Sequence, residues 1–269
     1  MKSIQRLGLA LYSILSKAGF FSSPTGRKFF LLAYNYYKRF IEAGPVDGLR
    51  RFVSTHSVVI DVGANVGFFT LKFADWVGPE GSVIAIEPDL KNYTALQRAL
   101  SRTRNEARVQ VINAAVADKS GVLLFELNEV HPGDHKISVS QNGIEVPAIT
   151  LDSLVGQISP RRVSLVKIDV QGAESLVLNG AGDILRVHRP ALYVEVDEAA
   201  LAHFGSSSEK LVAGLETQGY RMFELLPDGT ASRIGRMELQ KRLSTRGYFD
   251  VLFLPRSGDD RGNKGQGGP

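Results

Sequence analysis

The sequence predicts an α/β fold, a doubly wound and mainly parallel sheet with helices on both faces. Short apolar runs rich in β-branched residues alternate with segments of helical periodicity, which is the pattern of βαβ units. A glycine-rich turn joins the first apolar run to the first helix. The composition of the 269 residues, 43% hydrophobic and 22% charged, is that of a globular chain and excludes a mainly disordered protein.

The first half of the alternation is regular. The apolar runs are expected to be strands buried on both faces, because they are apolar at consecutive positions. Asp89 is a suitable N-cap for the second of the two helices between them. The expected strands are residues 57–62, 82–86 and 109–116, and the expected helices are residues 68–77 and 89–102.

The pattern changes after residue 121, where we expect an antiparallel insertion. An Asn-Gly pair at 142–143 is a hairpin signal within it. The inserted strands are expected at residues 122–127, 136–141 and 145–150. The alternation then returns with strands at 165–170, 191–196, 220–225 and 248–254 and with helices at 173–178 and 207–218.

We divide the chain into a helical N-terminal arm (1–52), one domain (53–255) and a tail (256–269) that is expected to be disordered because it is polar and glycine-rich. Residues 1–51 hold nine basic and two acidic residues, a net charge of +7 that leaves −3 for the remainder. The apolar and aromatic residues of the arm predict either a helical cap on the domain or a basic amphipathic helix on a membrane surface.

The arm does not contain the roughly 18 consecutive apolar residues that a membrane-spanning helix needs. No small-residue cleavage site follows its apolar start, so a secretory signal is the weaker alternative. We therefore expect a cytoplasmic protein, with the arm at the inner face of the membrane in the second interpretation. Its aromatic residues cluster as in a core, so no nucleic-acid partner is predicted.

The absence of cysteine excludes disulfides, thiolate nucleophiles and cysteine-ligated metals. The five histidines show no metal-ligand spacing, so no metal site is predicted.

The turn after the first strand carries the strongest functional signal. Its sequence, IDVGANVGFFT at 60–70, follows a buried strand and opens a helix. Gly63 permits backbone torsions that other residues avoid, and Gly67 lets the helix start approach the strand closely. A carboxylate at Asp61 repels phosphate, and the glycine spacing is not that of a dinucleotide site. We predict a cofactor along Asp61, Gly63, Asn65 and Gly67.

Glu87 and Pro88 end the second strand, where an acid in a doubly wound fold accepts hydrogen bonds from both hydroxyls of a ribose. The two features together favour a nucleoside without a diphosphate. S-adenosylmethionine fits, because it joins adenosine to a sulfonium and an amino-acid end. At the end of the third strand, Ala115 would lie beside the adenine, and Asp118 would accept from its exocyclic amine or be only a turn residue.

Four segments of the chain resemble the FkbM-type methyltransferases, a family of S-adenosylmethionine-dependent enzymes. They are residues 60–70, 86–89 (IEPD), 149–154 (ITLDSL) and 166–174 (VKIDVQGAE), within a resemblance from about 53 to 255. The last segment is the most specific. The family often has Glu where Gln171 stands, which argues against a catalytic base at that position.

The resemblance implies a class I, Rossmann-like, seven-stranded sheet with an antiparallel last strand. It also implies an O-methyltransferase acting on a hydroxyl of a small molecule, namely a sugar, a glycolipid or a polyketide-like acceptor. An alcohol is a poor nucleophile, so a group that takes its proton is expected.

Asp169 is the first candidate for this base, because it follows the fourth parallel strand at the carboxyl edge of the sheet. It would otherwise only orient the cofactor or a loop. Lys167 lies on the same side of that strand and would pair with Asp169 or hold an anionic substrate. His135, in a turn between inserted strands, is the other candidate base, or is simply solvated.

Three other functions compete. A binding or scaffold protein would keep the cofactor fold without turnover, and an N- or protein methyltransferase would need no strong base. An NAD-dependent oxidoreductase is disfavoured by the glycine spacing and by Asp61.

Overall fold

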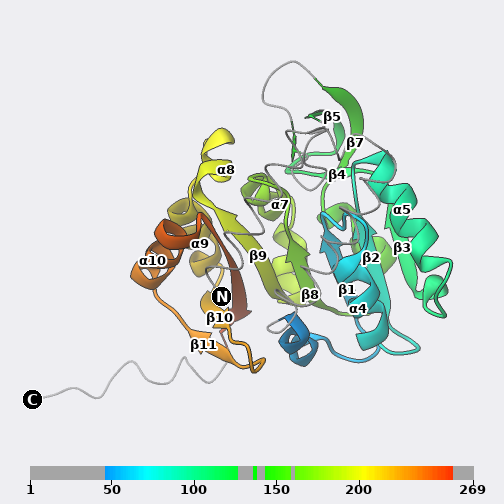
Figure 1. Ribbon diagram of the computed structural model, residues 1–269, viewed down its shortest axis with the longest axis horizontal. Coiled ribbons are helices and arrows are strands. Elements are labelled where there is room, and N and C mark those ends of the chain that lie inside the picture. The colour runs from blue at the N-terminus through cyan, green and yellow to red at the C-terminus, as the bar shows by residue number, and fades with distance from the viewer. Residues whose placement is uncertain (1–45, 127–135, 138–142, 159–160, 257–269) are drawn as a thin grey trace, which may run out of the picture.

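The computed structural model describes residues 46–126, 136–137, 143–158 and 161–256. Their main element is a sheet of eight strands in the order β11-β10-β12-β9-β8-β1-β2-β3 (Figure 1). Five neighbouring strands run parallel. They are β1 (Val58–Val62), β2 (Ser82–Ile86), β3 (Val109–Ile112), β8 (Val163–Ile168) and β9 (Ala191–Asp197).

The last strand, β12 (Tyr248–Pro255), runs antiparallel to both β9 and β10 (Tyr220–Leu225), as the resemblance implied. The expected number of seven strands was too small by one. The additional strand, β11 (Ala231–Arg233), forms a hairpin with β10 and makes the edge of the sheet. It is only three residues long, so its polar sequence carries no periodic signal.

Helices cover both faces of the sheet, which confirms the doubly wound fold. The face that carries Val59 packs against α4 (Phe68–Trp76) and the short 3-10 helix η3 (Asp47–Phe52). The face that carries Ile60 packs against helices that follow the insertion. These include α7 (Glu174–Asn179), α9 (Ser208–Thr217) and α10 (Arg236–Arg246). The remaining helical segments are α5 (Leu90–Leu100), η4 (Glu106–Arg108), η5 (Asp152–Leu154), α6 (Val155–Ile158), η6 (Ile184–His188) and α8 (Glu198–His203).

The insertion is a separate small sheet in the order β4-β7-β5-β6. Its central pair, β5 (Gly121–Glu126) and β7 (Ile144–Ile149), is antiparallel as predicted. The expectation of one strand over residues 109–116 was wrong. The chain turns after β3, where Asn113 donates to the carbonyls of Glu87 and Pro88, and continues as β4 (Ala115–Val116) in the small sheet. The fourth strand of this sheet is β6 (Lys136–Ile137).

Side-chain caps begin helices α5 and α9, and the predicted Asp89 cap is one of them. Asp89 accepts from the backbone N–H of Asn92 at the start of α5, and Ser207 accepts from that of Lys210 at the start of α9. Most of the predicted arm and nearly all of the tail lie outside the described residues. None of the helices that are described combines the length and the apolarity that crossing a membrane requires.

Candidate active site

The glycine turn between β1 and α4 lies at the point where the chain order of the sheet reverses. The chain moves from β1 to β2 and β3 on one side, and β8 later pairs with β1 on the other. In doubly wound sheets this point, at the carboxyl ends of the strands, is where ligands bind. Gly63, Asn65 and Gly67 all have positive φ, at 74°, 49° and 97°.

Two of these positions require glycine because of their neighbours as well as their torsions. A Cβ on Gly63 would lie 1.9 Å from the carbonyl oxygen of Asp169, so this turn touches the end of β8 directly. A Cβ on Gly67 would lie 2.4 Å from Cδ1 of Leu96. Gly67 therefore allows a close approach to α5. The sequence interpretation was that Gly67 brings the start of α4 close to β1, and the structure corrects it.

Glu87 fastens this turn to the end of β2. The side chain is 4% exposed, and its carboxylate accepts from the backbone N–H of Asn65 at 2.8 Å and from that of Asp89 at 3.0 Å. Burial raises the pKa of Glu87 to about 7, although both hydrogen bonds act in the opposite direction. Each carboxylate oxygen accepts several hydrogen bonds, so acceptor capacity remains for a ligand hydroxyl.

The other three predicted cofactor residues are placed differently from one another. Pro88 accepts from Asn113 through its carbonyl, and Ala115 is buried in β4. Asp118 is exposed, and its backbone lies beside Gly180 after α7. The Asn113 side chain thus contacts the backbone of the Glu87–Pro88 segment, while the Asn92 side chain hydrogen-bonds the Glu87 carboxyl group. A role of Ala115 and Asp118 beside an adenine remains a prediction.

A buried ion pair lies directly behind the turn. Asp61 on β1 and Lys167 on β8 are register partners in adjacent parallel strands, so their side chains emerge on the same face. The Lys167 ammonium is 3.5 Å from Asp61 Oδ1 and donates to the Gly63 carbonyl at 2.8 Å. Thr70, in the first turn of α4, donates to Asp61 Oδ2 at 2.6 Å.

Asp61 has no exposed surface, and burial raises its pKa while the Lys167 charge and the Thr70 hydroxyl oppose that rise. The ring of Phe69 closes the pair from α4, with the Lys167 ammonium 5.2 Å from its centroid. The buried Asp61 carboxylate therefore supports the glycine turn through its contacts with Lys167 and Thr70. A direct contact between Asp61 and a cofactor stays a prediction.

A second polar group stands where β8 and β9 end. The Lys167 ammonium is 3.5 Å from Asp169 Oδ2, and the amide of Gln171 donates to Asp169 Oδ1 at 3.1 Å and to Glu195 Oε2 at 2.9 Å. The Asp169 side chain is 27% exposed, in contrast to the buried Asp61. Lys167 thus joins the glycine turn to the partly exposed Asp169 carboxylate.

The loop before α7 holds Gln171 in this bridging position. Gln171 has a φ of 55°, which is unusual for a residue with a side chain. Glu174, 1% exposed, accepts from the backbone N–H groups of Val170 and Gly172 and so stabilises the loop. Burial raises the pKa of Glu174 to about 7. A Cβ on Gly172 would lie 2.3 Å from the Ala200 carbonyl, so the loop is pressed against α8.

The structure brings together Asp61, Gly63, Lys167 and Asp169 among the predicted residues, and Asn65 with Glu87. Gly67 lies instead against Leu96 of α5. His135 lies outside the described residues. Sequence reasoning missed Thr70 as the partner of the Asp61 carboxylate and Asn113 as the partner of the backbone carbonyls of Glu87 and Pro88. It expected Gln171 to keep hydrogen bonding without a charge, but it did not identify Asp169 and Glu195 as the two carboxylates to which the amide donates. The one available signal was the position of Thr70 in the first helical turn after a buried acid.

The donors and acceptors of this site fit S-adenosylmethionine. The turn from Gly63 to Gly67 contains no basic side chain, and the ammonium nearest to it is occupied by the Gly63 carbonyl and two carboxylates. The Glu87 carboxylate suits ribose hydroxyls. A diphosphate would meet carboxylates and no cation directed at it, which the geometry disfavours.

A comparison with family models matches residues 61–222 to the methyltransferase FkbM domain. The chain belongs to the FkbM methyltransferase family. The matched range contains all of the residues that build the site above.

Individual relatives are more distant. In an alignment of 149 residues the chain is 27% identical to methyltransferase 1 of Beauveria bassiana, with 47% of this chain and 59% of that protein's length covered. A crystal structure of methyltransferase FkbM from Methylobacillus flagellatus is 19% identical, with a TM-score of 0.47, covering 75% of this chain and 44% of that one. A SAM-dependent methyltransferase from Aquifex aeolicus is 16% identical, with a TM-score of 0.43, over 79% of this chain and 89% of that one.

Proposed function

We propose that this FkbM-family chain is an S-adenosylmethionine-dependent O-methyltransferase that acts on a hydroxyl group of a sugar, a glycolipid or a polyketide-like molecule. One observation carries the proposal. Lys167 joins the glycine turn, where a nucleoside fits, to Asp169, a partly exposed carboxylate at the end of the adjacent strand β8.

Cofactor binding would fall to the turn Gly63–Gly67 and to Glu87. When bound, S-adenosylmethionine supplies an activated methyl group, so the protein has to align the acceptor oxygen and exclude water. The hydrogen bond between Thr70 and Asp61 joins the two elements that flank the turn, α4 and β1. The Glu87 carboxylate accepts from the Asn65 N–H and so fixes the middle of the turn. The turn is thus preorganised on both sides.

Asp169 is the group proposed to take the proton of the acceptor hydroxyl. Its Oδ2 faces the Lys167 ammonium and its Oδ1 accepts from Gln171, so the carboxylate is fixed in orientation. Both neighbours are hydrogen-bond donors, so neither competes with Asp169 as an acceptor for the hydroxyl proton. Glu195, held by the same amide, supplies a second acceptor for a neighbouring hydroxyl of a polyol. His135 remains an alternative base.

The cofactor part of the proposal is tested by calorimetric titration with S-adenosylmethionine and with S-adenosylhomocysteine. We expect the wild type to bind both, and Glu87→Ala to bind at least tenfold more weakly. Glu106→Ala, an exposed glutamate in η4, is the matched control and should bind as the wild type does. A folded wild type that binds neither compound would contradict the proposal and favour a scaffold.

The acceptor part is tested by turnover on hydroxylated and amine acceptors after the cofactor is saturated. We expect Asp169→Asn to keep cofactor affinity and to lose about 10²- to 10⁴-fold in turnover on a hydroxyl acceptor, the usual contribution of a general base. Full turnover of the variant on an amine would support N-methylation instead, because an amine needs no strong base.

A further inference from the structure

The loop between β8 and α7 carries two features that cost stability. Gln171 has a φ of 55°, a backbone conformation that residues with side chains rarely adopt. Glu174 is 1% exposed, and its Oε2 has no hydrogen-bond partner among the described residues. Strained backbone and unpaired buried polar atoms concentrate at functional sites. Their coincidence in one short loop indicates a conformation that is kept for function.

The other carboxyl oxygen of Glu174 accounts for the conformation of Gln171. Glu174 Oε1 accepts from the backbone N–H groups of Val170 and Gly172, both at 3.1 Å. These are the residues immediately before and after Gln171. One acceptor that holds both N–H groups closes the backbone around Gln171, and it thereby sets the direction in which the Gln171 side chain leaves the loop.

The end of the loop is clamped by its other neighbours. A Cβ on Gly172 would lie 2.3 Å from the carbonyl oxygen of Ala200 in α8. Ala173 belongs to the apolar cluster of the small sheet, with Phe125 and Val146. The loop thus lies between α8 and the small sheet, and the Glu174 carboxyl group fixes the residues that precede these contacts.

We propose that Glu174 is a positioning residue for methyl transfer, which acts through Gln171 on the orientation of Asp169. The proposal rests on the function proposed above, in which Asp169 takes the proton of the acceptor hydroxyl. The Gln171 amide donates to Asp169 Oδ1 at 3.1 Å and to Glu195 Oε2 at 2.9 Å. A loop that released Gln171 would therefore remove one of the donors that orient Asp169.

A neutral carboxyl group suits this role. Burial raises the pKa of Glu174 to about 7, and the nearby Asp169 charge acts in the same direction. A protonated carboxyl group still accepts both N–H groups at Oε1, and it avoids a buried charge at the unpaired Oε2. Glutamine reproduces this arrangement with a carbonyl oxygen and an uncharged NH₂ group, whereas leucine keeps the volume and removes the acceptor.

Hydrogen exchange of the full chain at Val170 and Gly172 tests the placement. In the wild type both N–H groups should exchange slowly. Glu174→Leu should speed their exchange about tenfold or more, because both lose their acceptor, and Glu174→Gln should keep them close to the wild type. This readout needs neither cofactor nor acceptor, so it decides the placement even where the proposed function fails.

Turnover on a panel of methyl glycosides, at saturating cofactor, tests the consequence. Glu174→Leu should lower kcat about ten- to a hundredfold with unchanged S-adenosylhomocysteine affinity, and Glu174→Gln should restore most of the loss. The double variant Glu174→Leu/Gln171→Leu should be no slower than Gln171→Leu alone, because residues that act as a unit have non-additive effects.

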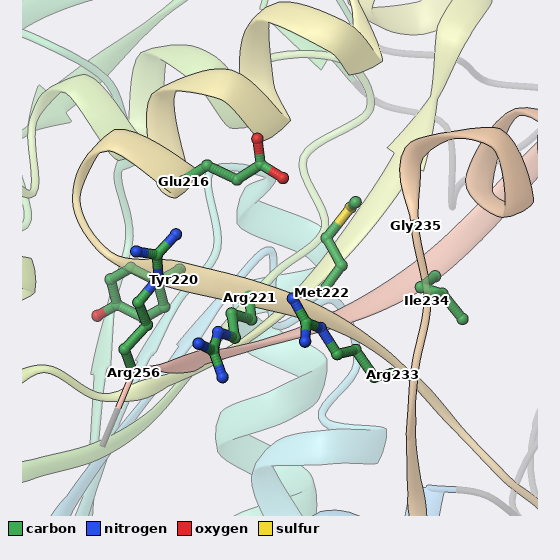
Figure 2. Close-up of a pocket in the computed structure, with 8 residues that line it drawn as sticks. All are labelled: Glu216, Tyr220, Arg221, Met222, Arg233, Ile234, Gly235 and Arg256. Carbon is green, nitrogen blue, oxygen red and sulfur yellow. The ribbon is translucent and has the colours of Figure 1, made fainter. Parts of the chain in front are cut away.

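Two control variants separate this role from a general loss of stability. Asp152 Oδ1 likewise accepts from two backbone N–H groups, those of Asp183 and Ile184, and Asp152→Ala should leave turnover unchanged. Glu216→Leu makes the same substitution at a glutamate that pairs with Arg236. Glu216 lines a surface pocket of about 420 Å³ at the start of β10, away from the loop (Figure 2), so exchange at the loop and turnover should not change.

Rapid exchange of Val170 and Gly172 in the wild type would overturn the proposal without any variant, including a Glu174→Leu chain that does not fold. Unchanged exchange in Glu174→Leu, no recovery in Glu174→Gln, or additive losses in the double variant would overturn it as well. A wild type that binds neither S-adenosylmethionine nor S-adenosylhomocysteine would contradict the proposed function instead, and the exchange result would still decide whether Glu174 places Gln171.

Discussion

Replacement of Lys167 by methionine tests the buried ion pair that supports the candidate site. The methionine keeps most of the side-chain length and removes the ammonium that lies 3.5 Å from both Asp61 and Asp169. At that distance, with an effective dielectric constant of about 20, one pair of charges interacts by roughly 5 kcal/mol. Asp61 would remain fully buried with only the Thr70 hydroxyl as its partner.

Removing one partner of a buried pair typically costs about 3–5 kcal/mol, and we expect that loss in the free energy of unfolding of Lys167→Met at pH 8. The loss should be smaller at pH 5. Burial already raises the pKa of Asp61, and without the lysine that pKa rises further. The folded variant then holds a proton that the unfolded chain releases, so its stability falls as pH rises from about 4 through the folded pKa.

Urea denaturation at pH 5 and pH 8 measures both effects. Lys72→Met is the matched control, because Lys72 pairs with Asp47 at the surface and should contribute less than about 1 kcal/mol at either pH. The double variant Lys167→Met/Asp61→Asn should recover much of the stability at pH 8. A Lys167→Met loss no larger than that of Lys72→Met, or equal at the two pH values, would refute the reasoning.

Three further outcomes follow from the same geometry. The pKa values of Glu87 and Glu174 are raised to about 7, so both groups hold protons in the folded state that the unfolded chain releases. The free energy of unfolding of the wild type should therefore fall between pH 4.5 and 7, by up to about 3 kcal/mol per group. Urea denaturation across this pH range measures the loss. Gly63→Ala should unfold or lose S-adenosylhomocysteine binding, because its Cβ would overlap a carbonyl oxygen. Gly156→Ala has open space around its Cβ and should keep both the fold and the binding. Thermal unfolding and calorimetry measure the two effects. Gln171→Leu should lower turnover about ten- to a hundredfold with unchanged S-adenosylhomocysteine affinity, and a loss of affinity instead would contradict its placement on the acceptor side.

Local information was sufficient for most of the strands and helices and for the glycine turn of the site. Buried strands such as Val58–Val62 and Ser82–Ile86 are apolar at consecutive positions, and Asp89 and Ser207 are caps that act over three residues. The glycine turn could be recognised for the same reason, since its torsions are a local demand. These features depend on neighbours within one turn or one strand, which a sequence displays directly.

The partners of the functional side chains were decided only in three dimensions. Asp61 meets Lys167 because β1 and β8 are adjacent and in a particular register, and the Gln171 amide meets Glu195 only because β9 lies beside β8. The break between β3 and β4 likewise depends on Asn113 reaching the end of β2. The sequence by itself determined the strands, the turns and the acidic residues at their ends. Which of those charges are buried, paired or left facing an acceptor was settled by strand order and register, because pairing in a parallel sheet joins residues that are far apart in the chain.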